Sequence, residues 1–74
     1  MDAIPLNNLG RVLRSPRGGH DKWFIRVERE VGGAFLILLM KNPHDRSAEA
    51  FDGWVEDDEA LARYLEEWEI EWSA

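Results

Sequence analysis

The sequence contains no cysteine, so neither a disulfide bond nor a thiolate metal site can stabilise the chain. Absence of cysteine is typical of proteins in a reducing compartment. Long apolar runs are also missing, because the longest spans only residues 34–40, whereas a membrane-spanning helix needs about 20 residues. No targeting segment is visible at the start of the sequence. We therefore expect a cytoplasmic protein without a membrane partner.

Positive charge is scarce in the last part of the chain. Residues 47–74 hold a single base, Arg63, and ten acids, whereas residues 1–46 hold eight bases and five acids. The formal charge is therefore +3 in the first part and −9 in the second, which gives the net charge of −6. A net negative charge argues against binding to nucleic acid. The clustering of acids at one end of the chain is informative about binding partners and not about the fold.

The length of 74 residues corresponds to one domain with a limited hydrophobic core. Hydrophobic residues make up 45% of the chain and charged residues 32%, a balance typical of a globular protein. Residues 1–8 contain chain-breaking residues and predict a loose N-terminal arm. Residues 9–74 are then the single folded domain.

Alternating apolar and polar residues predict two strands joined by a hairpin. Residues 23–30 alternate with a period of two, which is typical of a half-buried strand. Residues 34–40 are apolar on both faces, which predicts an interior strand covered on both sides. The glycines at 32–33 between these stretches favour a tight turn.

Two further strands are predicted on weaker patterns. Residues 9–14 form a short candidate strand before the turn-rich stretch 15–21. Residues 50–55 form another, and Gly53 within it suggests a β-bulge.

The last third predicts one helix and a short strand. Leu61, Tyr64, Leu65 and Trp68 have the spacing of one helix face, so we expect an amphipathic helix over about 57–68. Residues 69–72 alternate like a strand, which would bury both of their large apolar side chains; the alternative is that the helix continues to Trp72. The predicted fold is α+β: a small antiparallel sheet of four or five strands with one helix packed on one face. The other face then needs cover from the arm, through Ile4 and Leu6, or from another chain.

An acidic tract beside exposed tryptophan predicts a binding surface for a basic protein. Trp54 falls on the opposite strand face from Phe51 and Val55 and is the best candidate for an exposed anchor, with Trp72 the second. Clustered carboxylates speed association with a surface of opposite charge. The alternative is that acids at a helix start only stabilise the helix and keep the surface soluble. The candidate partner-binding residues are Asp52, Trp54, Glu56, Asp57, Asp58, Glu59 and Trp72.

A basic, glycine-containing loop suggests weak phosphate binding. Such loops can cradle phosphate through backbone N–H groups, but this one lacks the spacing of known nucleotide-binding motifs. The alternative is a hairpin loop kept soluble by its charges. The candidate phosphate-binding residues are Arg14, Arg17, His20 and Lys22.

Catalytic and metal-binding patterns are not evident. His20 and His44 are each followed by aspartate, but both pairs lie in predicted turns, where aspartate is common for backbone reasons. No serine lies in the context of a catalytic nucleophile. We expect neither enzymatic activity, nor a cofactor, nor a metal site.

These features favour a small acidic protein-binding domain, bacterial in character, such as an inhibitor or an immunity-type protein that occludes a basic partner. The second hypothesis is a self-associating structural domain with a homodimer interface on the uncovered sheet face. A third is a weak phosphate- or nucleotide-binding module.

Overall fold

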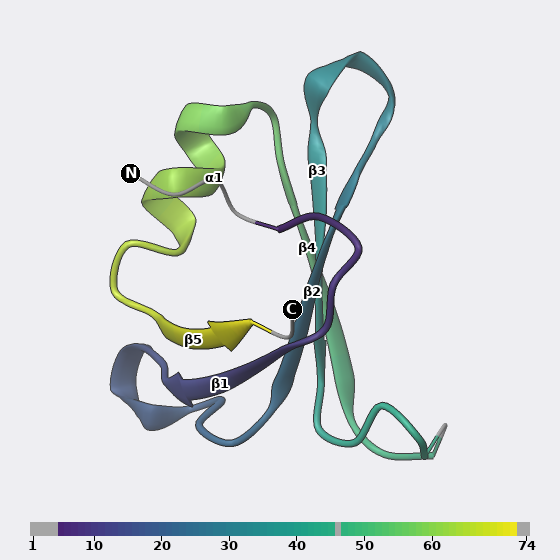
Figure 1. Ribbon diagram of the computed structural model, residues 1–74, viewed down its shortest axis with the longest axis vertical. Helices are drawn as coiled ribbons and strands as arrows, with labels where there is room; N and C mark the ends of the chain where they lie inside the picture. Colours follow the sequence, from purple (N-terminus) through teal and green to yellow (C-terminus); the bar gives the residue numbers. More distant parts are fainter. Residues whose placement is uncertain (1–4, 46, 73–74) are drawn as a thin grey trace.

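The computed structural model describes residues 5–45 and 47–72. Within them, five strands form one antiparallel sheet in the order β4-β3-β2-β1-β5, and one α-helix packs alongside (Figure 1). This confirms the predicted α+β fold. The elements are β1 (Gly10–Arg14), β2 (Phe24–Arg29), β3 (Phe35–Met40), β4 (Ala50–Val55), α1 (Asp58–Tyr64) and β5 (Glu69–Trp72).

The β2–β3 hairpin is the centre of the sheet, as its alternating pattern predicts. The two strands pair without interruption from Phe24 opposite Met40 to Arg29 opposite Phe35. The connecting turn, Val31–Gly33, contains two glycines with positive φ, 84° at Gly32 and 85° at Gly33. Glycine adopts this conformation without the steric cost that other residues incur.

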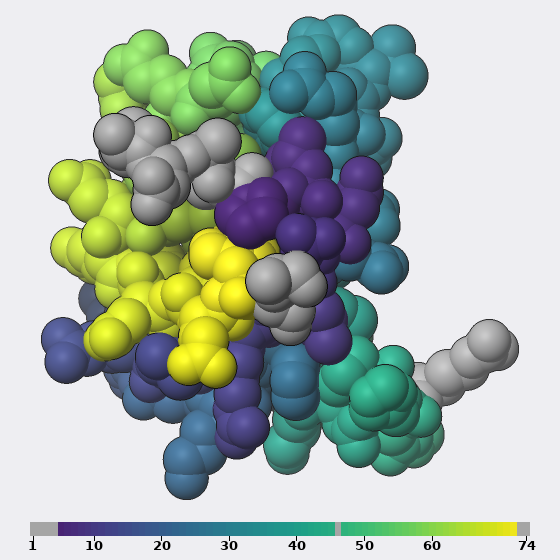
Figure 2. Space-filling view, viewed as in Figure 1, coloured from purple at the N-terminus to yellow at the C-terminus, as the bar shows by residue number. Residues whose placement is uncertain are grey.

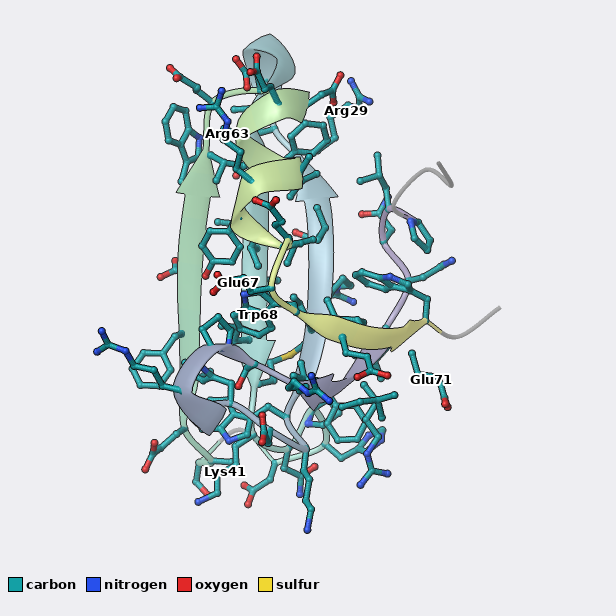
Figure 3. The ribbon with its side chains drawn as sticks, turned by 90° about the vertical axis from the view of Figure 1, so that its left-hand side faces the viewer. Arg29, Lys41, Arg63, Glu67, Trp68 and Glu71 are labelled. Atoms are coloured by element: carbon teal, nitrogen blue, oxygen red, sulfur yellow. The ribbon has the colours of Figure 1, made fainter. Side chains whose placement is uncertain are left out.

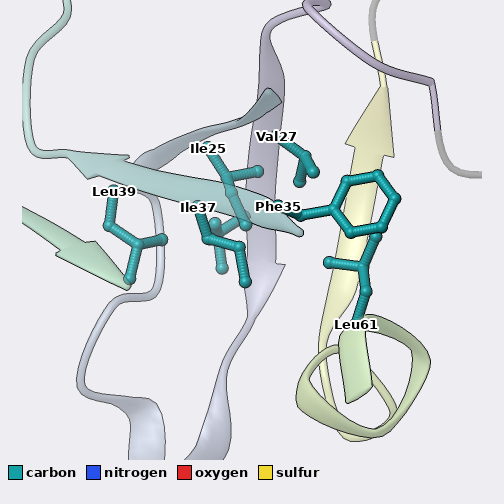
Figure 4. Packing of buried hydrophobic residues seen from close by; sticks show 7 residues of the cluster. Ile25, Val27, Phe35, Ile37, Leu39 and Leu61 are labelled. Carbon is teal, nitrogen blue, oxygen red and sulfur yellow. The ribbon is translucent and has the colours of Figure 1, made fainter. Parts of the chain in front are cut away.

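The core lies between the sheet and α1. Buried side chains of β2 and β3 point to the side of the sheet that carries the helix, and Leu61 of α1 packs against them (Figure 4). This side is called the helix side from here on. Its buried cluster comprises Val12, Ile25, Val27, Phe35, Ile37, Leu39 and Leu61.

The helix begins where the sequence predicts but ends earlier. Asp57 caps it, because its Oδ1 accepts a hydrogen bond of 2.8 Å from the N–H of Ala60. The helix ends at Tyr64 rather than at 68, since the chain must turn before β5 pairs with β1. A backbone hydrogen bond from Trp68 N to Leu65 O closes that turn.

The last strand, β5, occupies residues 69–72 as predicted and lies beside β1. Ile70 pairs with Val12 and Trp72 with Gly10, so both apolar side chains face the helix side. The irregularity of the sheet lies here, between Val12 and Arg14, where the β1–β5 register shifts.

The prediction of a bulge at Gly53 is wrong, because β3 and β4 pair in continuous register along all of β4. Gly53 instead lies under the ring of Tyr64, whose hydroxyl is 3.5 Å from where a Cβ would stand. Partial burial raises the pKa of this hydroxyl.

The described part of the N-terminal arm is attached to the domain on the helix side. Asn7 N donates a 2.8 Å hydrogen bond to Val27 O, and Leu6 packs against the core cluster. The space-filling view shows this segment lying against β5 and the β2–β3 hairpin (Figure 2). Leu6 therefore does not cover the opposite sheet face, and Ile4 lies, with residues 1–3, outside the described residues.

Candidate docking surface

The sheet face opposite the helix side is uncovered by α1 and β5, which lie together on the other side of β2–β4 (Figure 1). It is called the open face here. Strand alternation and register place nine side chains of β2–β4 on it. They are Phe24, Arg26, Glu28, Leu36, Leu38, Met40, Ala50, Asp52 and Trp54.

Apolar side chains fill the middle of the open face. Leu36, Leu38 and Met40 occupy alternate positions of β3, and all three are half-buried. Trp54 lies opposite Leu36 on the neighbouring strand and is 63% exposed. The prediction that residues 34–40 form an interior strand is therefore correct, but only the helix side of that strand is covered by the described elements. An uncovered row of apolar side chains with an exposed indole is typical of a protein interface.

The open face carries charges of both signs. Arg26 is its base, and Glu28 and Asp52 are its acids. Arg26 Nε lies 3.1 Å from Glu28 Oε2. Arg11 of neighbouring β1 pairs in register with Glu71 of β5, so these two add no net charge. The open face thus has a formal charge of −1 on a molecule of net charge −6.

The seven predicted partner-binding residues are divided between the two sides of the sheet. Asp52 and Trp54 share the open face, and Glu56 follows exposed at the end of β4. Asp52, Trp54 and Glu56 therefore lie close together at the end of β4, and Trp54 is exposed as expected.

The other four members have positions on the helix side or roles within the helix. Asp57 is the helix cap, and Glu59 forms an ion pair with Arg63 one turn later. Asp58, Glu59 and Trp72 line a cavity of about 900 Å³ that is bordered by α1, β5 and Leu6. Figure 3 looks onto this side, where Arg63, Glu67 and Trp68 are seen. Trp72 and Trp54 therefore face opposite directions.

The predicted phosphate loop is held together by its own side chains. Asp21 Oδ1 accepts hydrogen bonds from Ser15 N and Oγ at 2.7 and 2.9 Å, and Ser15 Oγ accepts one from His20 N. Arg14 Nε lies 3.9 Å from Glu69 Oε2. Arg17 and Lys22 are exposed and have positive φ.

The ring of His20 belongs to an aromatic cluster rather than to an open anion site. Its centroid lies 4.9 Å from that of Trp23, 5.8 Å from that of Phe51 and 5.9 Å from that of Trp68. Trp23 and Trp68 are both half-buried and pack against the core cluster. Of the four candidate phosphate ligands, Arg14 and His20 already have partners within the chain.

The second histidine–aspartate pair has a local structural role. Asp45 Oδ1 accepts hydrogen bonds from Ser47 Oγ at 2.7 Å and from Ser47 N at 2.9 Å. These bonds, the side-chain one first, lower the pKa of Asp45. Among the described residues, no three histidine, cysteine or carboxylate side chains are grouped as metal ligands. No helix in that part of the chain is long and apolar enough to span a membrane.

Comparison of the chain with protein-family models, with curated proteins and with solved structures gave no match. Function is therefore inferred from the site itself. The sequence pattern already indicated Trp54 and Asp52, but it missed Arg26 as a site residue. Only strand register shows that Arg26 lies level with Asp52 on the same face.

Proposed function

We propose that this chain is a self-associating protein-binding domain and that the open face is the interface between two copies. The observation that supports this proposal is the uncovered apolar row of β3 with the 63% exposed Trp54 beside it. Exposed apolar area of this kind is costly in water, and its burial is the main driving force of protein association. Buried tryptophan is also among the residues that contribute most to binding energy.

The charge of the open face favours a second copy over a basic partner. A basic protein would be attracted to a surface of strong negative charge, whereas the open face has a formal charge of only −1 and includes Arg26. Several of the carboxylates that make the chain acidic lie elsewhere, at the start of α1 and on β5. A face with charges of both signs can be complementary to itself.

The size of the molecule also favours self-association. The molecule is small, with principal extents of 31 × 25 × 23 Å. The buried core is small, since seven side chains form its central cluster. Small domains without disulfides commonly gain stability by forming oligomers. We place this domain in the cytoplasm, for which the absence of cysteine is the support.

The first test measures mass against concentration by sedimentation equilibrium. We expect a monomer–dimer equilibrium whose dissociation constant rises about 10- to 100-fold in Trp54→Ala, because truncating a central aromatic anchor costs about 2 kcal/mol or slightly more. Val31→Ala is the matched control, since Val31 is 99% exposed at the hairpin tip but is not on the open face. A wild-type chain that stays monomeric at every concentration would contradict self-association and leave the open face to a different protein.

The inhibitor or immunity-type hypothesis, with a basic partner, stays a prediction. Its support is the exposed Trp54 between Asp52 and Glu56. Phosphate binding by the loop of Arg14, Arg17, His20 and Lys22 also stays a prediction, although two of these side chains already have partners within the chain.

A further inference from the structure

We infer that the two copies pack face to face about a two-fold axis that runs along β3, so that Arg26 of each copy pairs with Asp52 of the other. This inference rests on the proposed self-association and adds its orientation and its specificity-determining residues. It starts from the strand register.

One cross-strand row of the open face carries opposite charges on either side of its centre. Arg26 of β2 and Asp52 of β4 both pair with Leu38 of β3, so they lie at the same height on the sheet. Adjacent strands are about 4.8 Å apart, which places the two charged residues at nearly equal distances from Leu38. From β2 to β4, the row therefore consists of a base, a leucine and an acid.

A two-fold axis in the interface and parallel to β3 exchanges the two flanks of this row. The partner's β4 then lies over β2, and the partner's β2 lies over β4. Arg26 meets the partner's Asp52, Asp52 meets the partner's Arg26, and the two Leu38 side chains meet on the axis. Because a two-fold interface repeats every contact, one favourable pairing counts twice.

The other in-plane orientation is disfavoured by charge. An axis in the interface and perpendicular to the strands places each strand opposite the same strand of the partner. Arg26 would then face the partner's Arg26, and Asp52 would face the partner's Asp52. Like charges brought together across an interface disfavour association. Both axes keep the strands of the two sheets aligned, as is usual for sheets that pack face to face. The charge pairing is therefore what favours the axis along β3.

The neighbouring rows fit the same axis by size. In the row of Met40, Phe24 lies on β2 and Ala50 on β4, so each phenyl ring meets the smallest side chain of the partner's face. In the row of Leu36, Trp54 lies on β4 and Glu28 on β2. Each indole therefore lands beside the Arg26–Glu28 ion pair of the partner, where a guanidinium can stack on it.

Arg26 is positioned for this exchange. Its Nε is the atom that approaches Glu28, at 3.1 Å and without the angle of a hydrogen bond. The two terminal nitrogens of the guanidinium remain for the partner's carboxylate. The Arg26 side chain is 41% exposed, so a carboxylate from a second copy can reach it.

The test uses two single charge reversals and their mixture. Arg26→Asp gives a face with two acids in the row, and Asp52→Arg gives a face with two bases. Each variant alone should dimerise more than about tenfold more weakly than the wild type, because every pairing is then of like charge. An equimolar mixture should form a heterodimer, since each acidic row meets a basic row. The double variant Arg26→Asp/Asp52→Arg should recover the homodimer.

Matched controls change the same charge away from the open face. Lys41→Asp alters net charge as Arg26→Asp does, and Glu67→Arg alters it as Asp52→Arg does; Lys41 and Glu67 are both exposed (Figure 3). Both controls should dimerise as the wild type does, within about threefold. Hybrid formation is read by native mass spectrometry, with one variant isotopically labelled.

The outcomes separate the two proposals. If the wild type dimerises but neither single reversal differs from its control, or if mixing gives no heterodimer, the orientation is wrong and self-association stands. If the wild type is monomeric, both proposals fail. Loss of the far-UV circular dichroism signal identifies a reversal that does not fold. Arg26→Gln and Asp52→Asn then replace the reversals, and the inferred pairing requires their combined effect to be smaller than the product of the separate ones.

Discussion

Gly10 shows how a single residue decides how closely the side chains of β5 can pack on β1. A Cβ at this position would stand 2.7 Å from Trp72 Cε3 and 2.8 Å from Ile70 Cγ2, closer than side-chain atoms can approach. Glycine is thus required by the close packing of Trp72 over β1, and not by an unusual backbone angle.

At the same scale, we expect Gly10→Ala to lower the free energy of unfolding by about 1–3 kcal/mol, because the added methyl group overpacks this contact. Urea unfolding followed by tryptophan fluorescence measures the change. Gly19→Ala is the matched control, since its Cβ would meet only Pro16 O at 4.0 Å and its φ of −68° suits alanine. Equal stabilities of the two variants would show that Trp72 does not pack over Gly10.

Helix α1 is the element that covers the core, although it is short. It spans Asp58–Tyr64 and contributes one buried residue, Leu61, to the central cluster. Helices of this length are marginal by themselves, so packing and capping both contribute to its stability. The cap is Asp57, whose carboxylate accepts the N–H of Ala60 at 2.8 Å.

At the element scale, Asp57→Ala should lower the free energy of unfolding by about 1 kcal/mol through loss of the cap. Asp58→Ala removes a carboxylate from the same first turn without removing a cap bond, so we expect a loss of only a few tenths of a kcal/mol. Thermal unfolding at low salt compares the two variants. A loss at Asp57 no larger than that at Asp58 would mean that both acids act only through their charge.

Charge is the property that belongs to the whole molecule. The net charge of −6 makes two copies repel each other, and the open face, with a formal charge of −1, adds little to that repulsion at the point of contact. The acids near the start of α1 add to the repulsion without being on the open face. Asp58, for example, lines the cavity on the helix side.

At the scale of the whole molecule, reversing Asp58 and Glu59 to lysine should leave the dimer intact and tighten it slightly, since both line the helix-side cavity. The two substitutions change the net charge from −6 to −2, which reduces repulsion between copies. Sedimentation equilibrium at low and high salt measures this, with the largest gain expected at low salt. Loss of the dimer in this variant would assign the interface to the acidic tract instead.

Local patterns in the sequence determined most of the elements. A period of two indicated β2, a run that is apolar on both faces indicated β3, and residues 50–55 and 69–72 coincide with β4 and β5. The same alternation put Trp54 on the opposite face from Phe51 and Val55, and Trp54 is indeed exposed at the uncovered side. These predictions succeeded because the direction of a side chain along one strand depends only on its neighbours in sequence.

Other features depended on which distant segments meet, and only the tertiary structure decided them. The placement of β1 between β2 and β5, the end of α1 at Tyr64, and the side to which Leu6 binds all follow from pairing between remote parts of the chain. The row of Arg26, Leu38 and Asp52 is of the same kind, since register fixes it and no local pattern encodes register across three strands. The sequence by itself therefore determined the strands, the helix and the separation of charge. The tertiary structure determined which sheet face is left open and which charged side chains share a row on it.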